Sequence, residues 1–261
     1  MSDWIKKLFV EHSDFFLKLL NERWSRTEEL VNGMVKVLNN YGINSGNLLD
    51  LCCGNGRIAV HMAKKGFKAV GVDISKVFLE DAKRKAEKHR VSDMVTFLEG
   101  DIRKLKDTLK NILQPFDVVV NAWTSIGYFS REEDLDVFRQ ARELSREGAI
   151  LFLAETMHSQ YIALKFVPTS YAEIDNMVLL ENRKYDPTTS EMNTTWSFYV
   201  KDGENLRFID KVEWSIHVYS LSEISAILRR AGWEIEAYYG SFSTLQPFNP
   251  LTSLNIVAKA K

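Results

Sequence analysis

Residues 47–73 place the strongest constraint on how this chain can fold. An apolar run from Leu48 to Leu51 leads into the turn CCGNG at 52–56, and apolar residues then recur at helical spacing until Gly66. A second apolar run, 67–72, ends in Asp73, about 20 residues past the turn. The order strand, glycine turn, helix, strand and acid predicts an α/β fold with a parallel sheet.

The residue types in this segment predict a nucleotide-cofactor site. Gly54 and Gly56 let the backbone approach a ligand, and the free N–H groups at the start of the helix point at an anionic group. Asp73 would place two carboxylate oxygens beside a ribose diol. With Ala59 the glycines also fit the dinucleotide pattern G-x-G-x-x-A, so the turn alone does not choose between nucleotide cofactors.

Three further features favour S-adenosylmethionine. They are Asp50 at the end of the first strand, Gly100-Asp101-Ile102 after a third strand, and the order of the elements downstream. Together they resemble class I S-adenosylmethionine-dependent methyltransferases, whose motif D-L-G-C-G-x-G corresponds to residues 50–56 here. Cys52 stands where the first glycine usually does, and its side chain would narrow the methionine end of the pocket. The resemblance covers roughly residues 25–261 and is most specific over 47–102.

The resemblance implies a doubly wound, Rossmann-like sheet of seven mostly parallel strands, closed by an antiparallel pair at 233–239 and 254–260. Between 155 and 220 the periodicity changes from helical to alternating, as in Met192, Thr194 and Trp196. We therefore expect an inserted antiparallel β-sheet after strand 5, at 156–220, that caps the substrate. Residues 1–155 and 221–261 would form the cofactor-binding domain, with a helical lid at the N-terminus.

The resemblance also implies roles for individual cofactor-binding residues. Asp73 would bind the ribose, Asp101 the adenine amino group, and Arg26 the methionine carboxylate. A helix-capping role for Asp101 and a solvated Arg26 are the structural alternatives. The residues expected to contact the cofactor are Trp24, Arg26, Asp50, Cys52, Cys53, Gly54, Asn55, Gly56, Asp73, Ile74, Phe78, Asp101, Ile102, Asn121 and Trp123.

Composition narrows the partners and the compartment. The 261-residue chain has a net charge of −1, so no global field favours a nucleic acid or an anionic membrane. Its only cysteines are adjacent, which disfavours a disulfide, and further thiols for a metal site are lacking. No apolar run approaches the roughly 20 residues of a membrane span, and the N-terminus is too charged for a signal peptide. We expect a cytoplasmic monomer or homodimer without a metal.

The expected reaction is transfer of a methyl group from S-adenosylmethionine to a nitrogen or oxygen of a small molecule, with S-adenosylhomocysteine as product. Tyr128, His217 and Tyr219 are candidate catalytic residues, with packing roles as the alternative, and no motif names a general base. The loop at 121–129 lacks the Pro-Pro-aromatic sequence of many enzymes that methylate planar amides or nucleobase amines. An RNA or protein methyltransferase, an NAD(P)-dependent oxidoreductase and a non-catalytic cofactor-binding protein are the rival functions.

Overall fold

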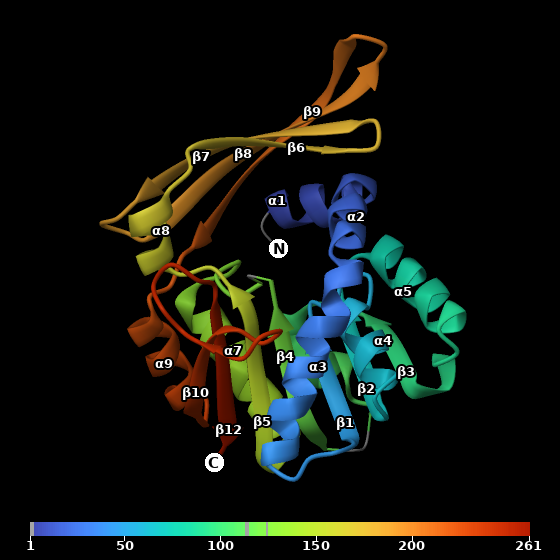
Figure 1. Ribbon diagram of the computed structural model, residues 1–261, viewed down its shortest axis with the longest axis vertical. Coiled ribbons are helices and arrows are strands. Elements are labelled where there is room, and N and C mark those ends of the chain that lie inside the picture. Colours follow the sequence, from blue (N-terminus) through green and yellow to red (C-terminus); the bar gives the residue numbers. More distant parts are fainter. Residues whose placement is uncertain (1–2, 113–114, 124) are drawn as a thin grey trace.

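The computed structural model, which describes residues 3–112, 115–123 and 125–261, has two separate β-sheets (Figure 1). The larger sheet has the order β11-β10-β12-β5-β4-β1-β2-β3. Strands β5, β4, β1, β2 and β3 run parallel, and β12 pairs antiparallel with both β5 and β10. The strands are β1 Gly46–Leu51, β2 Phe67–Asp73, β3 Val95–Glu99, β4 Phe116–Ala122, β5 Ser145–Thr156, β10 Trp233–Ser241, β11 Gln246–Pro247 and β12 Leu254–Ala260.

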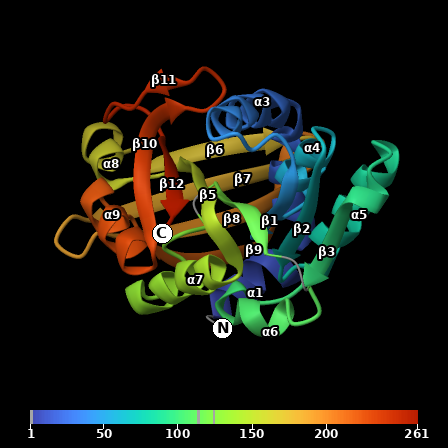
Figure 2. The ribbon, with the colours of Figure 1, turned by 90° about the horizontal axis from the view of Figure 1, so that it is seen from below.

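This arrangement confirms the predicted Rossmann-like, mostly parallel sheet closed by an antiparallel pair. The structure adds an eighth strand, because the two residues of β11 pair with β10 at the edge of the sheet. Strand β5 also begins at Ser145, before the Gly148 turn signal. Figure 2 shows helices on both faces of the sheet.

Helices on the two faces explain why the central strands read as continuous apolar runs. Leu48 packs in a core that includes residues of α3 Trp24–Asn40, α4 Arg57–Ala63 and α5 Lys76–Lys88. The next residue, Leu49, packs in a second core that includes residues of α6 Leu105–Thr108, α7 Arg131–Glu143 and α9 Leu221–Arg230. Strands buried on both faces need apolar side chains at successive positions.

The smaller sheet is antiparallel throughout, in the order β6-β7-β8-β9. Its strands are β6 Thr169–Ile174, β7 Met177–Asp186, β8 Glu191–Asp202 and β9 Asn205–His217. They confirm the predicted inserted sheet between β5 and α9, which we call the cap sheet. A short helix, α8 Ser159–Lys165, precedes it. The domain boundaries at 155–156 and 220–221 stay a prediction.

The N-terminal segment lies between the two sheets (Figure 1). The sequence predicts one amphipathic helix there, whereas the structure has three pieces: α1 Asp3–Lys6, a π-helical turn η1 Lys7–Glu11 and α2 Ser13–Glu22. Lys7 and His12 hold the segment to the cap sheet by pairing with Asp210, at 3.0 Å and 2.8 Å. Among the described residues, no helix is long and apolar enough to cross a membrane.

Candidate functional site

Two adjoining cavities lie where β1, β2, β3 and β4 end, which is the edge where open parallel sheets bind ligands. The inner cavity has a volume of about 70 Å³ and is lined by residues that follow these strands and by the N-terminal segment. The outer cavity, of about 610 Å³, lies between the strand ends and the cap sheet, whose Trp196 and Trp214 line it.

Four aromatic residues line both cavities, and we call them the aromatic collar: Phe9, Phe16, Trp123 and Tyr128. Phe9 stacks on Tyr128 with ring centroids 5.6 Å apart, and Phe16 lies 5.5 Å from Trp123. Two of the four rings come from the N-terminal segment and two from the loop after β4. The collar therefore exists only when the N-terminal segment is closed over the sheet.

Nine of the residues predicted from the sequence line the inner cavity. They are Cys52, Gly54, Asp73, Ile74, Phe78, Asp101, Ile102, Trp123 and Tyr128. Apart from Phe78 on α5 and Tyr128 in the loop after β4, they come from the ends of four neighbouring strands. The glycine turn, the acid after β2 and the segment after β3 therefore meet as expected.

Asp73 is held by backbone hydrogen bonds on both carboxylate oxygens. Its Oδ2 accepts from the Gly54 N–H at 2.8 Å and its Oδ1 accepts from the Ser75 N–H at 2.9 Å. Each carboxylate oxygen keeps one further lone pair for a donor in the cavity. Burial raises the pKa of Asp73 to about 6, and the backbone hydrogen bonds limit the rise.

Asp101 has the capping role considered for it in the sequence, and its adenine-binding role stays a prediction. It caps the turn that follows β3 by accepting from the Arg103 N–H at 3.0 Å, and it also lines the inner cavity. The Arg103 guanidinium pairs with Asp101 at 2.7 Å and with Glu133 at 2.8 Å, and it lies 4.7 Å from the Phe129 ring centroid. This ion pair fixes the carboxylate in the lining of the inner cavity.

Two predicted polar residues lie behind the cavity wall. Asp50 is 2% exposed and accepts from the Ala59 N–H at 3.1 Å, so it joins the end of β1 to the first turn of α4. Burial raises its pKa to about 7. Asn121, at the same level of β4, is 2% exposed, and its Oδ1 has no partner among the described residues. Neither side chain lines either cavity.

Three residues of the glycine turn have structural contacts, and their predicted contacts with the ligand stay predictions. The Cys53 side chain packs against Gly71, where an added Cβ would lie 2.7 Å from its sulfur. Gly56 has a φ of 71°, and an added Cβ would meet the Ala82 side chain at 2.8 Å. Asn55 donates from Nδ2 to the Asn21 side chain at 2.9 Å, which ties the turn to α2. None of the three lines a cavity.

Trp24 and Arg26, at the start of α3, contact different parts of the structure. Trp24 faces α4 and α5, with its ring 4.7 Å from that of His61 and the Lys85 ammonium 4.7 Å from its centroid. This packing agrees with the structural alternative for Trp24, and its contact with the cofactor stays a prediction. Arg26 lines the outer cavity and not the inner one.

The floor of the outer cavity contains a cluster of arginines around one carboxylate. Glu155, at the end of β5, accepts from Arg57 at 3.0 Å and from Arg23 at 3.5 Å. Arg23 also lies 4.1 Å above the Trp123 ring, and its pKa is lowered by burial and by the charges of Arg57 and Arg26. On the cap side, Glu181 pairs with Arg183. Both carboxylates that line this cavity are therefore held by guanidinium groups.

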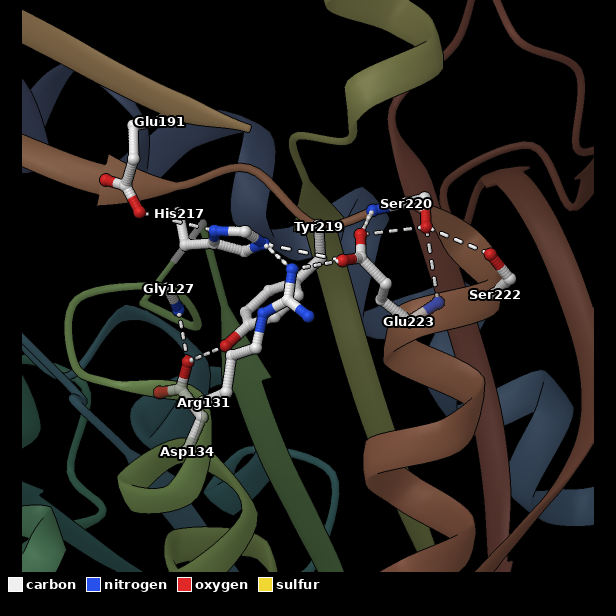
Figure 3. A network of polar contacts seen from close by, with 9 residues as sticks. All are labelled: Gly127, Arg131, Asp134, Glu191, His217, Tyr219, Ser220, Ser222 and Glu223. Carbon is white, nitrogen blue, oxygen red and sulfur yellow. Dashed lines mark hydrogen bonds and ion pairs between the residues drawn. The ribbon is translucent and has the colours of Figure 1, made fainter. Parts of the chain in front are cut away.

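His217 and Tyr219 belong to a polar network outside both cavities (Figure 3), so their catalytic role stays a prediction that the cavity lining does not support. The Tyr219 hydroxyl donates to Asp134 Oδ2 at 2.8 Å, and the Gly127 N–H donates to the same oxygen at 3.0 Å. The His217 ring is hydrogen-bonded to Arg131 at 3.1 Å and to Glu191 at 3.3 Å. Of the three candidates, Tyr128 alone reaches the cavities.

Sequence reasoning missed the residues that come from outside the strand ends. Phe9 and Phe16 were part of a predicted amphipathic helix, but the pattern does not say which of its apolar residues reach a ligand. Arg23 and Glu155 lie 132 positions apart, and no sequence motif indicates that they form a pair. In the structure Glu155 has a φ of 53°, a strained value for a non-glycine residue that points to a functional position. Among the described residues, no cluster of histidines, cysteines and acids could hold a metal ion.

Comparisons with known proteins agree with this geometry. Residues 48–148 match the family described as a methyltransferase domain. The chain is 27% identical over 207 residues to YqeM of Bacillus subtilis (strain 168), a protein named as a methyltransferase, and the match covers 77% of this chain and 79% of that one.

Solved structures share the whole fold. A crystal structure of an S-adenosylmethionine-dependent methyltransferase from Clostridium acetobutylicum ATCC 824 matches with a TM-score of 0.73 at 18% identity, over 89% of this chain and 91% of that chain. The sugar N-methyltransferase KedS8 from Streptoalloteichus sp. ATCC 53650 matches with a TM-score of 0.66 at 17% identity, over 89% and 87%.

The matching domain, the methyltransferase relative, the shared fold and the strand-end cavity together define the class of this protein. It contains a methyltransferase domain, and its fold is the one found in S-adenosylmethionine-dependent methyltransferases. The predicted fold and enzyme type are thereby confirmed, and the shared fold supports the predicted class and cofactor.

Proposed function

We propose that this enzyme transfers a methyl group to the nitrogen of an amine on a small molecule that binds in the outer cavity. The observation that carries the proposal is the aromatic collar, because it is the one wall that a methyl donor in the inner cavity and an acceptor in the outer cavity would share. A cationic group is attracted to aromatic faces, so the collar suits a reaction in which positive charge crosses it.

The residues that line the inner cavity suit S-adenosylmethionine, which would enter once the N-terminal segment opens. Asp73 has a lone pair free on each oxygen for the two ribose hydroxyls, and the Asp101 carboxylate and Ile102 would face the adenine. Gly54, with a φ of 54°, keeps the backbone close to the ligand, and an added Cβ would lie 3.1 Å from Leu20. Bound there, the cofactor supplies an electrophilic methyl group on a sulfonium. We assign no cofactor contact to Trp24.

An amine acceptor is favoured over a hydroxyl because no described residue of the two cavities offers an available base beside the collar. Three collar residues cannot accept a proton, and burial raises the pKa of the Tyr128 phenol, which keeps it protonated. Glu155 and Glu181 are engaged by arginines. A neutral amine brings its own lone pair and afterwards loses its extra proton to solvent, whereas an alcohol needs a base.

The charges of the outer cavity support the same choice. Arg23, Arg26 and Arg183 line it against two carboxylates. An excess of positive charge lowers the pKa of a bound amine, which favours the neutral, nucleophilic form. The positive charge lies on sulfur before the transfer and on nitrogen after it. The aromatic collar would stabilise the cation in both states.

The size of the outer cavity favours a small acceptor. A volume of about 610 Å³ is within the range of roughly 300–1,000 Å³ for small-molecule pockets. The fold shared with a sugar N-methyltransferase is consistent with an amino sugar as one acceptor class to test. An RNA or protein acceptor is the alternative that the same experiment addresses.

The test is a matched screen of acceptors with the purified full chain. Pairs that differ only in the nucleophile, such as glucosamine with glucose and an aryl amine with its phenol, are incubated with S-adenosylmethionine, and S-adenosylhomocysteine and the methylated product are measured by mass spectrometry. We expect product from at least one amine and none from its hydroxyl partner. Equal methylation of a hydroxyl partner, or methylation of RNA or protein alone, contradicts the proposal.

A further inference from the structure

The loop at 123–129 determines the position of half of the aromatic collar, since it carries both Trp123 and Tyr128. Its backbone is unusual at both of the points that matter. Trp123 has a φ of 58° and Gly127 has a φ of 96°, both in the left-handed region. Such a backbone keeps its shape only when contacts outside the loop hold it.

Gly127 is where those outside contacts converge (Figure 3). Its N–H donates to the Asp134 carboxylate at 3.0 Å, and its carbonyl accepts from the His217 N–H at 3.0 Å. A Cβ at this position would lie 2.2 Å from the His217 carbonyl oxygen, so only glycine fits between the loop and the end of β9. The loop is thereby joined to the first turn of α7 on one side and to the cap sheet on the other.

Asp134 is the buried centre of this arrangement. It is 3% exposed, and its Oδ2 accepts from both Gly127 and the Tyr219 hydroxyl. Among the described residues no cation pairs with this carboxylate, and the neighbouring Glu133 charge adds to the cost of ionising it. Tyr219 lies just after β9, so its hydroxyl connects the same carboxylate to the cap sheet a second time.

We propose that Asp134 is a positioning residue, which holds the Tyr128 loop in a fixed relation to the cap sheet through Gly127 and Tyr219. The proposal rests on the proposed function, because Tyr128 matters to transfer only if the collar surrounds the reacting groups. Asp134 and Tyr219 touch neither cavity, so their effect on the collar passes through Gly127. We call the contacts among Gly127, Asp134 and Tyr219 the latch.

The variants separate a latch from ordinary packing. Asp134→Asn keeps a carbonyl oxygen that can accept both hydrogen bonds, whereas Asp134→Leu removes both and Tyr219→Phe removes one without changing the ring. Ser145→Ala is the matched control, because it removes a buried hydroxyl hydrogen bond of 2.7 Å to the last turns of the same helix, at Ala141, away from the cavities.

The first readout is amide hydrogen exchange across residues 121–130, which needs no acceptor. Losing one net hydrogen bond should raise exchange there by about two- to tenfold in Tyr219→Phe, and more in Asp134→Leu. Asp134→Asn should exchange like the wild type, and Ser145→Ala should not change this segment. The proposal is overturned if Tyr219→Phe and Asp134→Leu exchange in this segment like Ser145→Ala. If Asp134→Leu does not fold, Tyr219→Phe alone decides the test.

The second readout is the ratio of affinities for S-adenosylmethionine and S-adenosylhomocysteine by calorimetry. The two ligands differ at the sulfur, so the ratio reports the contact of the sulfonium with the collar. Tyr219→Phe should shift the ratio against S-adenosylmethionine by about two- to fivefold, the scale of one cation–π contact, while S-adenosylhomocysteine binds as in the wild type. Asp134→Asn should keep the wild-type ratio of affinities. If Tyr219→Phe lowers the affinity for both ligands equally, the latch has a purely structural role.

A Tyr128→Leu variant distinguishes failure of the latch from failure of the proposed function. If it lowers the ratio while Tyr219→Phe and Asp134→Leu do not, the collar acts as proposed and the latch is refuted. If Tyr219→Phe and Asp134→Leu raise exchange across residues 121–130 but Tyr128→Leu leaves the ratio unchanged, the latch stands and the role of the collar is refuted.

Discussion

Replacing Asp73 by Asn should separate cofactor binding from folding more sharply than any other single change. Each Asp73 oxygen already accepts one backbone N–H, from Gly54 or Ser75, which leaves one lone pair on each for the ribose. Asn removes one of those acceptors and the charge. The lost charge-assisted hydrogen bond is worth about 1.5–3 kcal/mol, so calorimetry should show S-adenosylmethionine binding weakened by about 10- to 150-fold.

The pH dependence of the wild type gives an independent check of the same group. Burial raises the pKa of Asp73 to about 6 in the free protein, and ribose hydroxyls donate to the ionised form. As pH falls through 6, a proton must leave before the cofactor binds, so affinity should drop about tenfold between pH 7.5 and pH 5. Asp73→Asn has no such proton at this position and should lose this pH dependence.

Asp117→Asn is the matched control for this experiment. Asp117 is also 7% exposed and accepts a backbone N–H, from Asn47 at 2.7 Å, but it lies near the start of β4 at the opposite edge of the sheet. Its replacement should cost stability and leave cofactor affinity unchanged. Unchanged affinity in Asp73→Asn, or an equal loss in both variants, would remove Asp73 from the ribose site.

Two further predictions concern Arg26 and nucleic acids. If Arg26 binds the methionine carboxylate, Arg26→Ala should lower the affinity for S-adenosylmethionine by about tenfold. The affinity for decarboxylated S-adenosylmethionine should stay unchanged. An unchanged affinity for both ligands would contradict this role and leave Arg26 as a wall of the acceptor cavity. With a net charge of −1, the protein should bind RNA or DNA no more tightly than about micromolar at physiological salt in a gel shift, and salt-resistant nanomolar binding would restore the nucleic-acid alternative.

The parts of the site that sequence could predict are those set by local structure. The apolar run at 48–51, the glycine turn and Asp73 lie within one strand-turn-helix-strand unit, so their spacing alone places them at the same edge of the sheet. The cap sheet was visible because alternating residues such as Trp196 and Phe198 put one apolar face toward the core.

The parts that sequence could not predict depend on contacts between distant segments. Phe9 and Phe16 reach the collar because the N-terminal segment lies between the two sheets, and a helical pattern does not contain that placement. Asp134 and Tyr219 are 85 positions apart in the chain, so neither predicts the other. Tyr219 shares its neighbourhood with His217, which made both resemble active-site residues although their hydrogen bonds point away from the cavities.

The closed N-terminal segment has a consequence for the speed of the enzyme. A cavity of about 70 Å³ is far below the roughly 300 Å³ at which pockets begin to enclose small ligands, so this conformation admits no nucleoside with a methionine tail. Cofactor entry and product departure therefore both require α2 to move from the glycine turn, which means parting Asn21 from Asn55. If α2 opens more slowly than the methyl group is transferred, the rate of opening limits turnover.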